Sequence, residues 1–390
     1  MSLIRHRPER GTKPPGGIAG PPPPAAESCP SLRVSFEYRP GQGEDAEPLL
    51  VLASPGTGLC GVFDGLGSAG AEMITTSAGP RSSAWAAARA AREAVRLRTD
   101  LLSVRSPGWP ASIDESGPYV EQPPAAPRSD LAAELLAVIQ WKLTETAAEI
   151  GAGNPRVKGR LSLPTTMAAA WFDLGAGEAA AAWAGNSRVY LLLPDAGLQQ
   201  VTTDDLETGD DALAALAQGS PISNCVSAGR DFTIHERRIS LDPPAVMFAA
   251  SDGCFGYVAT PLHFELMLLS TMHAALSWAD WQERLQAAIE GVAGDDATLA
   301  GFALGWPDFG ECRDAYAPRF RRCADLARDY DLAATEVARL RQRLESAQAG
   351  LITARQQLWD EYRTGYENLL SMPVRDLSGA DAGPPAASGG

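Results

Sequence analysis

Short apolar segments of strand length recur along most of this chain, and they limit its possible folds more than any other feature. Their apolar residues alternate or run continuously, and most segments are bounded by Gly, Pro, Asn or Asp, as β-strands are. The predicted strands cover residues 32–38, 49–53, 60–63, 167–174, 179–184, 188–193, 232–239, 246–250 and 298–304. One β-rich domain should therefore occupy about residues 32 to 306.

Amphipathic helices should separate the runs of strands. Two long helices are predicted over residues 83–98 and 130–150, and two shorter ones over 261–274 and 279–292. Because strands occur in runs and helices occur in pairs, without strict alternation, the order is typical of the α+β class. We expect two antiparallel β-sheets packed as a sandwich and flanked by helices.

Composition divides the rest of the chain. Residues 1–30 are rich in Pro and Gly and predict a disordered arm, and residues 371–390 predict a disordered tail. The Pro-rich stretch over 106–127 predicts a loop insertion inside the main domain, which we place at 31–308.

Residues 311–370 contain one proline, Pro318, and are rich in Arg, Glu, Ala and Leu, so they predict a helical segment. Apolar residues follow spacings of three and four along it, which indicates a heptad seam from about residue 333 to residue 369. The seam could pair in a coiled coil with a second copy or a partner protein, or it could pack along the main domain. The seam residues are Val337, Leu340, Leu344, Ala347, Leu351, Ala354 and Leu358.

Charge and cysteine content narrow the function classes. The formal net charge of −15 disfavours nucleic acid and acidic membranes as partners. No run of 18 apolar residues and no apolar leader segment are present, and the six cysteines show no CxxC spacing. We therefore expect a cytoplasmic protein with reduced thiols and no structural zinc site.

Acidic residues stand at the ends of four predicted strands. Because strands this apolar lie in a core, their ends should meet at one rim of the domain, where close carboxylates need protons or a cation. Oxygen ligands of this kind suit Mg²⁺ or Mn²⁺. A single Asp-Gly pair is usually only a turn, so the set carries the inference. The set consists of Glu44, Asp45, Asp64, Asp252, Asp295 and Asp296.

Seven short motifs occur in the order GEDA, VFDGLG, PTTMAAAW, AGNSRVYLL, VTTDDL, FAASDG and GDDATLAGFAL. As an ordered set they resemble the motifs of the metal-dependent protein phosphatases of type 2C, which include bacterial serine/threonine phosphatases. The resemblance covers about residues 32 to 306. It implies the same sandwich fold, and it implies hydrolysis of phosphoserine and phosphothreonine in proteins by water that two Mn²⁺ or Mg²⁺ ions activate.

The resemblance also implies roles for individual residues. Asp64 would bridge the two ions, and Asp252 and Asp295 would complete the site of the first. Glu44 and the Gly65 carbonyl would serve the second ion. The implied catalytic residues are Asp45, which would orient the attacking water, together with Asp64 and Asp252, and the candidate phosphate-binding residue is Arg39.

Several motif positions depart from the family pattern. Leu66 replaces a histidine that is a proposed general acid, and Asn186 replaces an aspartate. Pro164 and Pro40 occupy positions that are usually glycine and the phosphate-binding arginine, and no acid is available for a third ion. The alternative is therefore a weak or inactive phosphatase-like module that acts as a scaffold through its coiled coil, although the retained carboxylates favour an active enzyme.

Overall fold

The computed structural model describes residues 29–67, 69–76, 79–103, 131–153, 163–207, 221–228 and 230–374. The predicted loop insertion over 106–127 lies outside the described residues. The predicted arm over 1–30 and the predicted tail over 371–390 lie outside them for most of their length.

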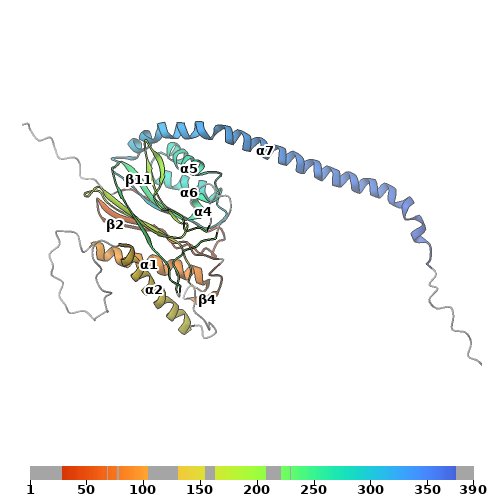
Figure 1. Ribbon diagram of the computed structural model, residues 1–390. Coiled ribbons are helices and arrows are strands. Elements are labelled where there is room, and N and C mark those ends of the chain that lie inside the picture. Colours follow the sequence, from red (N-terminus) through yellow and green to blue (C-terminus); the bar gives the residue numbers. More distant parts are fainter. Residues whose placement is uncertain are drawn as a thin grey trace, which may run out of the picture. The chain divides into compact units, whose positions relative to one another are not determined.

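Two five-stranded antiparallel sheets form the main domain (Figure 1). The first has the order β1-β12-β11-β8-β9 and the second has the order β10-β7-β6-β3-β2, while β4 and β5 form a separate hairpin. The strands are β1 Ser31–Phe36, β2 Leu49–Ser54, β3 Thr57–Val62, β4 Met73–Thr76, β5 Gly79–Ser82, β6 Met167–Asp173, β7 Glu178–Ala184, β8 Arg188–Leu193, β9 Gly197–Gln200, β10 His235–Ser240, β11 Ala245–Ala250 and β12 Ala297–Leu304.

The inner faces of the two sheets share one buried apolar layer. Alanines from β6, β7, β11 and β12 make up much of it, and their small side chains let the sheets approach closely. Larger side chains fill the remaining space, as where Phe172 and Phe302 meet edge to face with ring centroids 5.4 Å apart. The sandwich is therefore held by burial of continuous apolar strands, which is the pattern that the sequence predicts.

Helix pairs cover the two outer faces (Figure 1). Helices α1 (Ser83–Ser103) and α2 (Leu131–Gly153) cover the second sheet, where residues such as Ile139 and Leu143 are fully buried. Helices α5 (Pro261–Ala274) and α6 (Trp278–Glu290) cover the first sheet, and Trp281 lies at the centre of that layer. The predicted α+β sandwich flanked by helices is confirmed.

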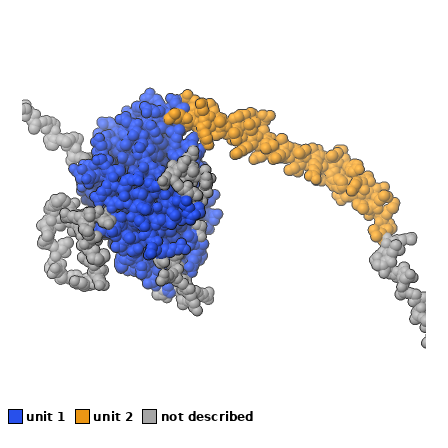
Figure 2. Space-filling model, viewed as in Figure 1, with its two compact units in different colours: residues 1–325 blue, residues 326–390 orange. Residues whose placement is uncertain are grey.

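The long helix α7 (Phe309–Tyr366) is followed by the short helix η1 (Asn368–Ser371). The chain divides into two compact units, Met1–Asp325 and Leu326–Gly390 (Figure 2). The first turns of α7 belong to the first unit, where Phe309, Cys312 and Tyr316 are buried and the Tyr316 hydroxyl donates to the Leu192 carbonyl at 2.6 Å. The predicted long C-terminal helix is confirmed. None of the described helices is long and apolar enough to span a bilayer.

Candidate carboxylate site

Strand register determines which loops meet at one end of the first sheet. Ala250 at the end of β11 pairs with Leu299 of β12 and with Arg188 at the start of β8. Phe36 at the end of β1 pairs with Ala297 at the start of β12. The residues that follow β1 and β11 and those that precede β8 and β12 therefore lie at the same end. These are the segments that carry most of the predicted site residues.

Three half-buried carboxyl groups meet at this end from three distant segments. Asp45 lies in the loop before β2, Asp64 follows β3, and Asp252 begins the short helix α4 (Asp252–Phe255) after β11. Burial is the main cause that raises the pKa of Asp64 well above its ordinary value, and the nearby Asp45 and Asp252 carboxyls raise it further. The structure thus brings together residues from both sheets at the rim of the sandwich.

The two remaining acids of the predicted site border this cluster. Burial is the main cause that raises the pKa of Asp295, and it likewise raises the pKa of Glu44, with Asp295 and Asp296 adding to the effect on Glu44. Asp295 in turn raises the pKa of Asp252, again after burial as the main cause. Glu44, Asp45, Asp64, Asp252 and Asp295 therefore form one electrostatically coupled group, which we name the carboxylate cluster.

Backbone contacts hold Asp64 against the start of β6. The Asp64 carbonyl accepts from the Thr165 hydroxyl at 2.7 Å and from the Thr166 backbone N–H at 2.8 Å. Gly65 has no room for a side chain, because a Cβ there would lie 2.9 Å from Glu44 Cβ and from two backbone oxygens. The predicted Glu44 and Gly65 are thus adjacent, and the glycine is needed for this close approach.

Asp296 fixes the loop that carries Glu44. Its carboxylate accepts from the backbone N–H of Tyr38 at 2.8 Å and from that of Glu44 at 2.6 Å. Ser251 positions the next residue of this loop, because its hydroxyl donates to Asp45 Oδ2 at 3.0 Å. Sequence reasoning missed Ser251, although its place directly before the Asp-Gly pair is a usable signal.

Asn186 positions Asp252. Its side-chain Nδ2 donates to Asp252 Oδ2 at 2.8 Å, and this hydrogen bond opposes the rise in the pKa of Asp252. The exposed Arg39 lies close enough to Asp295 that its charge opposes the rise that burial causes in the pKa of that carboxyl. The sequence placed Arg39 near the substrate and predicted for Asn186 only structural support in a turn.

The donor chemistry of the cluster fits a hard divalent cation. Among the described residues, no three Asp, Glu, His or Cys side chains are already arranged to hold a metal ion. The cluster nevertheless presents only oxygen donors, and its buried like charges repel one another unless protons or a cation neutralise them. Two oxygens at the cluster, Asp45 Oδ1 and Asn186 Oδ1, are buried with no hydrogen-bond partner in the described part of the chain.

A second polar network supports the turn before β8. Asp205 accepts from the Gly185 backbone N–H at 2.9 Å and from Asn224 Nδ2 at 2.7 Å, and it pairs with His235 Nε2 at 2.9 Å. Arg188 forms a two-pronged ion pair with the neighbouring Asp204. These contacts fix the turn that carries Asn186, so they act on the cluster only through that residue.

Comparison with known proteins gives structural matches only. No family model matches the chain, and no curated protein matches it. The serine/threonine phosphatase PstP/Ppp of Mycobacterium tuberculosis is 20% identical with a TM-score of 0.47, and the match covers 70% of this chain and 97% of that one. The catalytic domain of the serine threonine protein phosphatase PstP in complex with two manganese ions is 20% identical with a TM-score of 0.44, covering 70% and 96%.

The phosphatase Stp1 of Staphylococcus aureus is 17% identical with a TM-score of 0.47, and the match covers 74% of this chain and 100% of that one. Because all three TM-scores lie below 0.5, we infer neither the family nor the activity of this chain from these likenesses.

Proposed function

We propose that this chain hydrolyses phosphoserine and phosphothreonine in proteins and that it requires Mn²⁺ or Mg²⁺. The observation that carries the proposal is the convergence of five acidic residues, from four separate segments, into one partly buried cluster. A protein rarely buries so many like charges without a cation to neutralise them. The ordered motifs of the sequence support the same reaction.

The carboxylate cluster would hold two ions through Glu44, Asp64, the Gly65 carbonyl, Asp252 and Asp295. When bound, these ions would stabilise charge on the phosphoryl oxygens and make the attacking water more acidic. Asp45 would orient this water and accept its proton. Without bound ions, burial raises the pKa of Asp45 to about 7, and the two cations would lower it and leave the carboxylate ionised.

The state of the two buried thiols agrees with direct attack by water, because neither thiol can act as the nucleophile. Cys60 in β3 and Cys254 in α4 are both buried, and Cys254 lies close enough to Asp45, Asp252 and Asp64 for their charges to raise its pKa. Burial raises the pKa of Cys60 to about 12 and raises that of Cys254 well above its ordinary value, so both stay protonated at neutral pH and are poor nucleophiles. Leu66 has no proton to donate, so the leaving serine or threonine oxygen would take its proton from solvent. The exposed Arg39 would contact the phosphoryl group.

A phosphate-binding scaffold without turnover is the second candidate. Leu66 favours it, and so does the finding that no ready-made metal site of three side chains exists among the described residues. In either case we propose that residues 333–369 associate with a second copy or a partner protein. Leu344 and Leu351 in this stretch are 58% and 71% exposed.

Hydrolysis assays separate the two candidates. The full chain should hydrolyse p-nitrophenyl phosphate and a phosphothreonine peptide with Mn²⁺, and EDTA should stop both reactions. Asp64→Asn should be inactive, because a neutral amide binds a hard cation poorly. Asp195→Asn, in the exposed turn between β8 and β9, is the matched control and should retain full activity. Undiminished turnover in EDTA would disprove the metal requirement, and tight peptide binding without turnover would favour the scaffold.

A further inference from the structure

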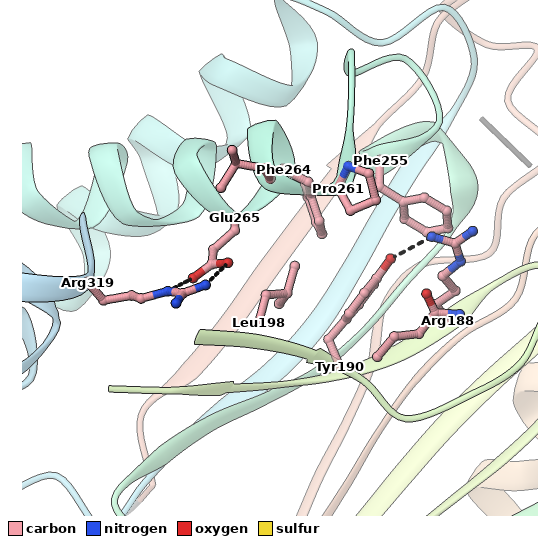
Figure 3. Close-up of a pocket in the computed structure, with 10 residues that line it drawn as sticks. Arg188, Tyr190, Leu198, Phe255, Pro261, Phe264, Glu265 and Arg319 are labelled. Atoms are coloured by element: carbon pink, nitrogen blue, oxygen red, sulfur yellow. Dashed lines mark hydrogen bonds and ion pairs between the residues drawn. The ribbon is translucent and has the colours of Figure 1, made fainter. Parts of the chain in front are cut away.

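A cavity of about 250 Å³ lies between β8, β9, α4, α5 and the first turns of α7 (Figure 3). All of its lining residues belong to the first compact unit. Its walls are mostly apolar and aromatic, and they include Tyr190, Leu198, Phe255, Leu262 and Phe264. Apolar walls with a few placed polar groups are typical of small-molecule sites, and this volume lies just below the usual range of roughly 300–1,000 Å³.

The ion pair of Arg319 with Glu265 stands at one end of the cavity, and Arg188 stands at the other (Figure 3). At one end Glu265 accepts two hydrogen bonds from Arg319, at 2.6 and 2.8 Å. At the other end Arg188 is bound by Asp204 at 2.8 and 2.7 Å. Arg188 is only 2% exposed and Glu265 only 4%, so each charge depends on its partner. Because both lining arginines are already neutralised, the cavity favours an uncharged ligand over an anion.

The cavity is lined by aromatic rings and carries one hydrogen-bond donor. The Arg188 guanidinium lies 4.3 Å from the centre of the Phe255 ring, and Arg188 Nη1 donates to the Tyr190 hydroxyl at 3.1 Å. The Tyr190 hydroxyl accepts in that contact, and its own proton has no acceptor among the hydrogen bonds of the described residues. A flat aromatic ligand, whose electron-rich ring face can accept the Tyr190 proton, would use both features.

The lining residues connect directly to the carboxylate cluster. Phe255 is the last residue of α4, whose first residue is Asp252. Arg188 lies two residues after Asn186, which donates to the Asp252 carboxylate at 2.8 Å. A molecule that contacts Phe255 and Arg188 therefore touches both segments that position Asp252.

We propose that this cavity is an effector site for a small, neutral, planar aromatic molecule of one or two rings. Its binding stabilises α4 and the turn before β8, and so controls the placement of Asp252. The effect on hydrolysis rests on the proposed phosphatase function, whereas ligand binding and the ordering of α4 do not.

Ligand-observed NMR titrations of the full chain test binding, with indole as the neutral probe and benzoate and benzylamine as charged probes of similar size. Indole should bind saturably. Leu262→Trp and Leu198→Trp, two independent variants that fill the cavity, should each weaken binding about tenfold or more. Leu276→Trp places the same ring at a residue that is 81% exposed, and it should leave binding unchanged. Absence of saturable indole binding, tighter binding of either charged probe, or equal binding by the filled variants would overturn the proposal.

Hydrogen exchange tests the coupling without any need for turnover. Indole should slow amide exchange in residues 251–257 of the wild type and should have no such effect in Leu262→Trp. It should also change the rate of Mn²⁺-dependent hydrolysis about twofold or more in the wild type only. Saturable binding with unchanged exchange in residues 251–257 would refute the regulatory role. Slower exchange in a chain that shows no hydrolysis would support the effector site while contradicting the phosphatase function.

Discussion

The metal-free protein should lose stability as the pH rises from about 4 to about 7. Burial raises the pKa of Asp45 from its ordinary value of 3.8 to about 7. In this range the folded chain keeps a proton that the unfolded chain has released, so folding becomes less favourable as the pH rises. The contribution is complete below pH 3.8 and is lost as the pH passes through about 7. The pKa values of Asp64 and Asp252 are also raised, which acts in the same direction.

The size of the effect follows from the shift in Asp45. A rise of about 3 in pKa corresponds to roughly 4 kcal/mol of unfolding free energy, at about 1.4 kcal/mol for each unit. Asp45→Asn removes the proton-linked group while keeping nearly the same shape, so at pH 8 without metal it should be more stable than the wild type. Near pH 4 the two should be similar.

Urea unfolding in EDTA at pH values from 4 to 8 measures this difference. Subtracting the wild-type curve from that of Asp45→Asn isolates the cluster from the many other carboxyls of the chain. Asp195→Asn controls for loss of one surface charge and should follow the wild type at every pH. Added Mn²⁺ should recover wild-type stability at pH 8, since a cation then replaces the protons. A wild type that equals or exceeds Asp45→Asn at pH 8 without metal would refute the reasoning.

Asp64→Asn and Asp252→Asn should each abolish Mn²⁺-dependent hydrolysis while circular dichroism stays that of the wild type; wild-type rates in either would remove that residue from the site. Asp296→Ala should free the loop of Glu44 and raise the Mn²⁺ concentration for half-maximal activity about tenfold, with an unchanged Mn²⁺ titration as the contrary result. Leu344→Asp combined with Leu351→Asp should dissolve a dimer in light scattering and leave p-nitrophenyl phosphate hydrolysis unchanged, because each buried Leu contributes about 1.5–3 kcal/mol; a wild type that is monomeric at all concentrations would show that a second copy is not the partner.

The sequence predicts the strands best where burial is continuous. Strands β6, β11 and β12 are apolar along nearly their whole length, and all nine predicted strands are present. Strands β4, β5 and β9 escaped prediction, since each has four residues and includes polar or turn-forming ones, such as GPRS in β5. Pairing with a neighbouring strand, rather than local composition, makes these segments extended.

The acids of the candidate site were predictable because they stand next to apolar strands. The residues that position them were not, because their contacts depend on tertiary register. Asn186 reaches Asp252 across 66 residues of sequence, and Asp296 reaches Glu44 across 252. The sequence alone predicts a turn residue at Asn186, and it does not distinguish the role of Asp296 from that of the adjacent Asp295.

Helix α7 shows the same division between local and tertiary information. Its heptad spacing is visible in the sequence, and the helix forms as expected. Its first turns differ from the rest of the helix in their contacts. Phe309 and Tyr316 pack into the core of the first unit, and Arg319 pairs with Glu265. The sequence shows no break at this point, so only the fold reveals that one helix serves two units.

The cluster depends on core packing as much as on its own acids. Asp252 and Asp295 interact because β11 and β12 pair in one register, and a slip by one residue would turn every side chain of a strand to the opposite face. Gly301 in β12 permits this close pairing, since a Cβ there would lie 2.4 Å from Phe248 Cβ and 2.7 Å from a backbone oxygen. A methyl group at Gly301 would push β11 and β12 apart, although Gly301 is not itself next to an acid of the cluster in the sequence. The placement of the carboxylates is therefore a property of the whole sheet, which explains why the residues that fix the site are spread through the core of the fold.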